Sequence, residues 1–200
     1  MEPKWQRISF MPATPLGEDG RRVTGSAAHI ALSRRAAAEG MVLLKNENET
    51  LPLKRGSRVA VFGKAQADYV KGGGGSGDTT VAYIRSLAQG LRMKQDEGKM
   101  EIFEPLERFY AEDVKAQYAA GATPGKTREP ILDDTLVQQA RAFTDTAVIT
   151  ICRFSGEDYD RTGQPHDGDY FLSFEEEHMV RKVLAAFPRV AVVLNTGGMM

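Results

Sequence analysis

The feature that most constrains this fold is a regular alternation between short apolar runs and longer amphipathic segments. Four apolar runs have the length and composition of buried strands: RVAVFG, MEIFEP, TAVITIC and RVAVVLN. Helices are expected before and between them, at about residues 26–40, 79–92, 106–121, 133–143 and 173–187. Uniformly apolar strands that alternate with helices are typical of a mostly parallel sheet covered on both faces. We therefore predict an α/β fold, with a parallel sheet sandwiched between helices.

Composition limits the partners of the chain. A net charge of −1 over 200 residues gives no reason to expect nucleic acid or an anionic membrane as a partner. No apolar run approaches the ~20 residues of a membrane span, and the first residues lack an apolar signal core. The single cysteine, Cys152, excludes an internal disulfide and is interpreted as a small buried strand residue. These features favour a cytoplasmic or otherwise reducing setting.

Two polar loops are expected at one edge of the sheet. Residues 64–78 follow the first strand and residues 153–171 follow the third, and ligands of open α/β sheets bind beyond the carboxyl ends of the strands. The second loop holds three closely spaced carboxylates, Glu157, Asp158 and Asp160. A partly shielded carboxyl group beside a like charge has a raised pKa and can act as a general acid. Arg161 is expected to keep one of the three ionised through a charge-assisted pair.

Other chemistries fit the residues of the same loop less well. Four aspartates offer oxygen ligands to a metal ion, but their spacing does not match the calcium-binding loop, so we expect no metal: Asp158, Asp160, Asp167 and Asp169. His166 is expected to be solvated rather than to bind a ligand or shuttle protons. Ser155 lacks the GxSxG surroundings of a serine nucleophile.

A glycine run, KGGGGSGD at residues 71–78, lies between the first strand and its helix. It satisfies GxGxxG, but the strand ends near Gly63, well before the run, and Asp96 lies in a loop rather than at the end of the second strand. A nucleotide-binding domain is therefore the less favoured interpretation. We expect instead a wide loop whose glycines allow close approach to a ligand or a neighbouring domain, with Ser76 and Asp68 on its rim. A simple flexible turn is the remaining alternative.

Five ordered segments resemble the α/β-sandwich domain of glycoside hydrolase family 3. They are AAAEGMVLLKNENETLPL, VAVFG, DYVKGGGGSGDTTV, SGEDYDR with GDYFLS, and VAVVLNTG. The resemblance runs from about residue 27 to the end of the sequence. It implies a partial sandwich domain at residues 27–200, preceded by an irregular, proline- and glycine-rich lead-in at residues 1–26. The family comprises β-glucosidases, β-xylosidases and related exo-acting, retaining enzymes that need no cofactor.

The resemblance also implies roles for individual residues. The family's sandwich domain lends the acid/base glutamate from a loop like SGEDYDR, which assigns that role to Glu157, with Asp160 and Arg161 as substrate contacts beside it. The glycine-run loop points to Ser76 as a further sugar contact. Asp158 stands where a second glycine is usual in the family, and this departure is the feature that favours a non-catalytic module.

The nucleophilic aspartate of the family lies on a barrel domain of the same polypeptide. Only about 26 residues precede the sandwich here, so the resemblance implies a member with reversed domain order and a barrel beyond Met200. We therefore expect part of a retaining β-glucosidase-like enzyme that acts on the terminal non-reducing residue of a β-glucoside or oligosaccharide, and that is inactive as this fragment alone. A non-catalytic carbohydrate-binding or structural sandwich module is the alternative.

Overall fold

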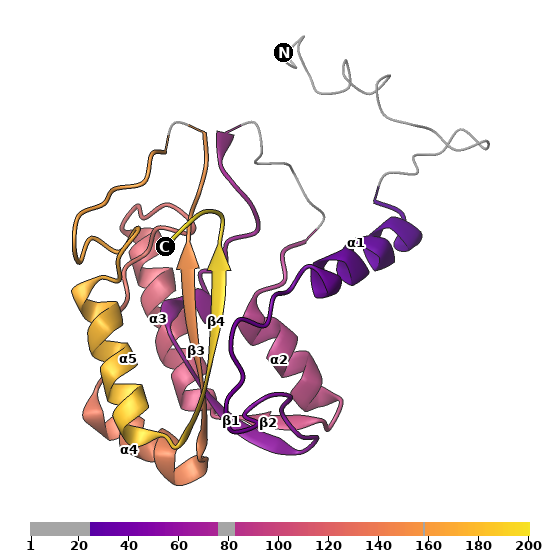
Figure 1. Cartoon of the computed structure of the whole chain (residues 1–200), viewed down its shortest axis with the longest axis vertical. Helices are drawn as coiled ribbons and strands as arrows, with labels where there is room; N and C mark the ends of the chain where they lie inside the picture. The colour runs from indigo at the N-terminus through magenta and orange to yellow at the C-terminus, as the bar shows by residue number, and fades with distance from the viewer. Residues whose placement is uncertain (1–24, 76–82, 158) are drawn as a thin grey trace. The chain divides into compact units, whose positions relative to one another are not determined.

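The computed structural model describes residues 25–75, 83–157 and 159–200. The chain divides into two compact units, Met1–Asn46 and Glu47–Met200. The first unit contains helix α1 (Ala27–Glu39), and the Ser26 side chain caps this helix by accepting a hydrogen bond from His29 N. The second unit contains the sheet and the remaining helices (Figure 1). None of the helices among the described residues is both long and apolar enough to span a membrane.

The second unit is built on a parallel sheet. Its strands are β1 (Ser57–Phe62), β2 (Met100–Ile102), β3 (Thr146–Arg153) and β4 (Arg189–Thr196), in the spatial order β2-β1-β3-β4. All three pairings are parallel. Every residue of the central strand β3 is buried. The strands β1 and β4 flank it, and side chains pack against it on both faces of the sheet. The predicted α/β fold is confirmed.

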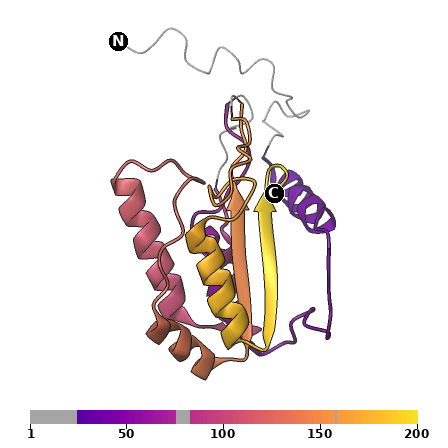
Figure 2. The ribbon, with the colours of Figure 1, turned by 60° about the vertical axis from the view of Figure 1, so that its left-hand side comes forward.

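Helices cover the two faces unequally (Figures 1 and 2). The helices α3 (Glu104–Ala119), α4 (Asp134–Phe143) and α5 (Phe174–Ala186) supply the larger apolar cluster, together with residues of β1 and β3 such as Phe62 and Ile149. The helix α2 (Leu87–Asp96) packs on the other face through Leu87 and Leu91, against a smaller cluster of residues from β1, β2 and β3.

Two predicted element boundaries differ from those of the structure. The helix predicted from Thr79 begins at Leu87, because Ser86 and Gln89 form a capping box in which each side chain bonds the backbone N–H of the other. The strand predicted to reach Pro105 ends at Ile102, because this proline already lies in the first turn of α3. The capping box predicted at the start of α5, between Ser173 and Glu176, is confirmed.

Glu129 is a carboxyl group buried in the second unit. Its side chain accepts a hydrogen bond from Lys64 N at 2.8 Å, and the residue is 6% exposed. Burial raises the pKa of Glu129 from 4.5 to about 8. The folded protein therefore holds this proton more tightly than the unfolded chain does, so stability from this group is full below about pH 4.5 and is lost as the pH rises toward about 8.

We expect Glu129→Gln to remove this dependence, because the amide does not ionise. The free energy of unfolding of the unsubstituted chain should fall with pH, by up to about 1.4 kcal/mol per pH unit from this group. Urea denaturation of both proteins between about pH 5 and pH 8 measures the difference in slope. Glu112→Gln, an exposed change on α3, is the control and should keep the parental slope. Parallel curves for the parent and Glu129→Gln would contradict the expectation.

Candidate active site

The described part of the glycine run, residues 71–75, lies beside the acidic loop beyond the carboxyl ends of β1 and β3 (Figures 1 and 2). Gly74 and Gly156 form an isolated parallel bridge, and Gly74 N donates a hydrogen bond to Ser155 O at 3.0 Å. A side chain at Gly73 would lie 2.9 Å from the same carbonyl oxygen. The prediction that these two loops meet at one edge of the sheet is confirmed.

Glu157 follows this bridge directly, and its side chain is exposed. The run reaches the glutamate itself, because a Cβ on Gly75 would lie 2.4 Å from both Cβ and Oε2 of Glu157. Gly75 also has a φ of +66°, a conformation that L-residues with side chains rarely adopt. The glycines therefore allow the backbone of their loop to pack against the acidic loop. At Gly75 this backbone contacts the Glu157 carboxylate.

The other predicted site residues have different surroundings. Ser76 and Asp158 lie outside the described residues, so their roles stay predictions. Asp160 is exposed. Arg161 forms an ion pair with Asp169, at the far end of the loop, and its predicted pairing with one of the three neighbouring carboxylates stays a prediction. The fold of the loop brings Asp169 back beside Arg161.

A buried ion pair lies where β3 runs into the acidic loop. Arg153 is 3% exposed, and its guanidinium donates to both carboxylate oxygens of Glu176 at 2.7 Å. It also donates to the carbonyl oxygens of Asp169 at 2.6 Å and Phe171 at 3.3 Å. Glu176 was predicted only as a capping residue. The pair joins the strand end to the start of α5 and fixes where the loop returns.

Hydrogen bonds inside the loop engage the remaining aspartates. Asp167 and Asp169 both accept hydrogen bonds from Thr162. The side-chain hydrogen bond from Thr162 lowers the pKa of Asp167. Desolvation works against a low pKa at Asp169, but hydrogen bonds from Thr162 and Arg161 lower it on balance. His166 stacks on Phe174, with ring centroids 4.0 Å apart, so it is packed rather than simply solvated.

Asp68 was expected on the rim of the glycine-rich loop, and this expectation is wrong. The residue is buried, with 1% exposure. Its carboxylate accepts hydrogen bonds from Tyr118 Oη at 2.5 Å, Gly125 N at 2.6 Å and Thr127 Oγ1 at 2.6 Å. Lys64 Nζ lies 3.1 Å away. Desolvation by burial works against ionisation, but the Lys64 ammonium and the hydrogen bonds lower the pKa of Asp68 on balance. Its local sequence gave no sign of these distant partners.

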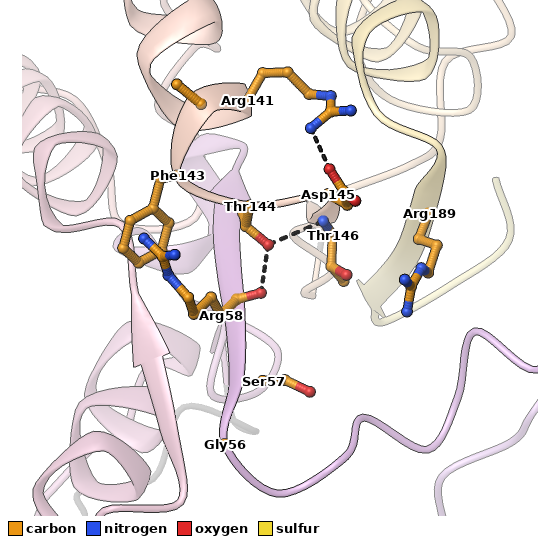
Figure 3. Close-up of a pocket in the computed structure, with 10 residues that line it drawn as sticks. Gly56, Ser57, Arg58, Arg141, Phe143, Thr144, Asp145, Thr146 and Arg189 are labelled. Carbon is orange, nitrogen blue, oxygen red and sulfur yellow. Dashed lines mark hydrogen bonds and ion pairs between the residues drawn. The ribbon is translucent and has the colours of Figure 1, made fainter.

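A hollow of about 400 Å³ lies at the opposite, amino-terminal end of the strands (Figure 3). The two arginines on its β1 and α4 sides have acidic partners: Arg58 contacts Glu101 and Arg141 pairs with Asp145. Thr144, which follows α4, connects this helix to β1 because its Oγ1 donates a hydrogen bond to Arg58 O at 2.6 Å. The hollow is thus separate from the edge that carries Glu157, and most of its charge is matched locally.

Comparison with known proteins identifies the domain. Residues 41–200 match the family model described as the Glycosyl hydrolase family 3 C-terminal domain. The chain is 46% identical to Beta-glucosidase A of Butyrivibrio fibrisolvens over 98% of its own length and 26% of that enzyme. It is 34% identical to a Beta-glucosidase of Ruminococcus albus over 82% of its own length and 17% of that enzyme.

Solved structures agree. A β-glucosidase from Paenibacillus barengoltzii aligns with a TM-score of 0.76 and 34% identity, over 85% of this chain and 18% of that one. β-Glucosidase 3B from Thermotoga neapolitana, in complex with α-D-glucose, aligns with a TM-score of 0.72 and 33% identity, over 84% of this chain and 24% of that one. The chain thus spans about a quarter or less of the length of these relatives. By its matching residues and the similarity of its fold to solved relatives, this chain belongs to glycoside hydrolase family 3, as a C-terminal-type α/β domain.

Proposed function

We propose that this chain supplies the general acid/base carboxyl group, Glu157, and part of the sugar site of a retaining, exo-acting β-glucosidase. The observation that carries the proposal is the packing of the glycine run against an exposed glutamate at the carboxyl edge of the sheet. This edge is where open α/β sheets bind ligands. The names of the relatives, all β-glucosidases, support the same reaction.

The mechanism is a double displacement. Glu157 protonates the leaving glycosidic oxygen while a second carboxylate attacks the anomeric carbon, and Glu157 then removes a proton from the incoming water. Retention of configuration needs the two carboxyl groups about 5–5.5 Å apart. We propose that a barrel domain of the same polypeptide provides the attacking carboxylate. The reaction needs no cofactor.

Three further residues are proposed to contact the sugar: Ser76, Asp160 and Arg161. Asp160 is exposed on the same loop as Glu157. Arg161 lies on the same loop, where its guanidinium pairs with Asp169. The substrate class is a β-glucoside or oligosaccharide with a free non-reducing end. A cytoplasmic location stays a prediction.

A chimera tests the proposal. This chain would replace the matching quarter of Beta-glucosidase A of Butyrivibrio fibrisolvens, to which it is 46% identical. We expect the chimera to hydrolyse an aryl β-glucoside, and the chain alone to be inactive because one carboxyl group cannot complete a double displacement. Hydrolysis by the chain alone would contradict the shared site. A folded but inactive chimera would favour the alternative of a non-catalytic carbohydrate-binding or structural module.

A further inference from the structure

A third loop, residues 122–128, reaches the acidic loop and has no role in the mechanism so far. The buried Asp68 carboxylate holds this loop through Gly125 N and through both N and Oγ1 of Thr127. Lys64 Nζ also lies 3.4 Å from Gly125 O, and donates to it. Gly125 and Thr127 are buried, whereas Lys126 between them is exposed. The anchor therefore fixes the direction in which the Lys126 side chain leaves the loop.

Lys126 ends on the aromatic rings of the acidic loop. Its Nζ lies 3.3 Å from the ring centroid of Tyr159 and 5.1 Å from that of Phe154. The two rings pack edge to face, with centroids 5.3 Å apart. An ammonium group over an aromatic face is attracted by the ring quadrupole. A Cβ on Gly125 would lie 3.1 Å from the Phe154 ring, so the backbone of the third loop also contacts the acidic loop.

We propose that Lys126 is a positioning residue for Glu157, which it holds in place by clamping Phe154 and Tyr159. These aromatic residues stand on either side of Glu157 in the sequence, so one ammonium group restrains the chain before and after the glutamate. An acid/base carboxyl group must sit within hydrogen-bond reach of the oxygen that it protonates, and a displacement of about 1 Å can cost about a hundredfold in rate. The inference rests on the proposed role of Glu157.

The first test measures how well ordered the acidic loop is in the 200-residue chain, and it requires no enzymatic assay. Amide hydrogen exchange of residues 154–160 should be about threefold to tenfold faster in Lys126→Met, which keeps the length of the side chain and removes its charge. Lys126→Arg keeps the cation and should restore parental exchange. Lys115→Met, an exposed change on α3, is the matched control. Parental exchange in Lys126→Met would overturn the proposal.

The second test uses the active chimera. Lys126→Met should lower kcat about threefold to tenfold with little change in KM, because a smaller fraction of the enzyme holds the acid in place. The loss in kcat/KM, which reports formation of the glycosyl-enzyme, should be largest for alkyl glucosides, whose leaving oxygen needs a proton, and smallest for dinitrophenyl glucoside, whose leaving group departs as an anion. Equal losses in kcat/KM on both substrates would indicate general damage to the fold and would overturn the positioning role.

The two proposals fail differently. If Glu157→Gln left the chimera fully active, the acid/base role would be wrong, and with it the positioning of a catalytic group, although faster exchange in Lys126→Met would still show the clamp. If Glu157→Gln abolished turnover while Lys126→Met kept parental exchange and kcat, the role of Lys126 alone would be wrong.

Discussion

Glu157→Gln should lower kcat/KM of the chimera for an aryl β-glucoside by about 10²- to 10⁴-fold, the usual contribution of a general acid or base. The amide can neither donate a proton to the leaving oxygen nor accept one from water. It keeps nearly the shape of the glutamate beside Gly75, whose backbone packs against this side chain, so the fold should survive. Steady-state kinetics with leaving groups of different basicity measure the effect, which should grow as the leaving group becomes more basic.

Azide separates the acid/base role from a general loss of function. This small anion can take the glycosyl group without help from a base, so it should partly restore turnover in Glu157→Gln and yield a glycosyl azide. Glu112→Gln, the exposed change on α3, should leave kcat/KM at the parental value. Parental turnover in Glu157→Gln would remove this residue from the role and direct attention to Asp160 on the same loop.

Asp68→Asn should lower the free energy of unfolding at neutral pH by about 3–5 kcal/mol, as expected when one partner of a buried ion pair is removed. The substitution leaves the Lys64 ammonium, itself 5% exposed, without its charge partner. It also replaces a carboxylate that accepts hydrogen bonds from three residues with an amide that has a single acceptor oxygen. Urea denaturation of the 200-residue chain measures the loss.

The dependence of the free energy of unfolding on pH below about 4 provides a second test of the same ion pair. The folded pKa of Asp68 lies below 3.8, so its stabilisation is full above that pH and is lost as the pH falls through the folded pKa. Asp68→Asn should lack this part of the acid dependence. The exposed change Asp96→Asn should cost less than about 0.5 kcal/mol. The double change of Lys64→Met with Asp68→Asn should recover part of the loss, because no unpaired charge remains. A loss below about 1 kcal/mol in Asp68→Asn would contradict the buried pair.

Local patterns in the sequence predicted most of the scaffold. Apolar runs indicated the four strands, and the order of strands and helices indicated a parallel sheet with both polar loops at one edge. Ser173 and Glu176 indicated the start of α5 correctly, because a capping box involves residues only three positions apart. The predicted start of α2 was wrong because the apolar pattern in the sequence extends upstream of the cap at Ser86.

The sequence by itself determined the fold class, the edge that carries the loops and the glutamate proposed as the acid. Only the tertiary structure decided which charges serve the scaffold: Asp68 bonds Thr127, 59 positions away, and Arg153 bonds Glu176, 23 positions away. It also decided that Arg161 pairs with Asp169 and that Lys126 meets Tyr159. The physical reason is range. Periodicity and capping act within a few residues along the chain, whereas the pairing of a buried charge depends on which distant segments the packed sheet brings together.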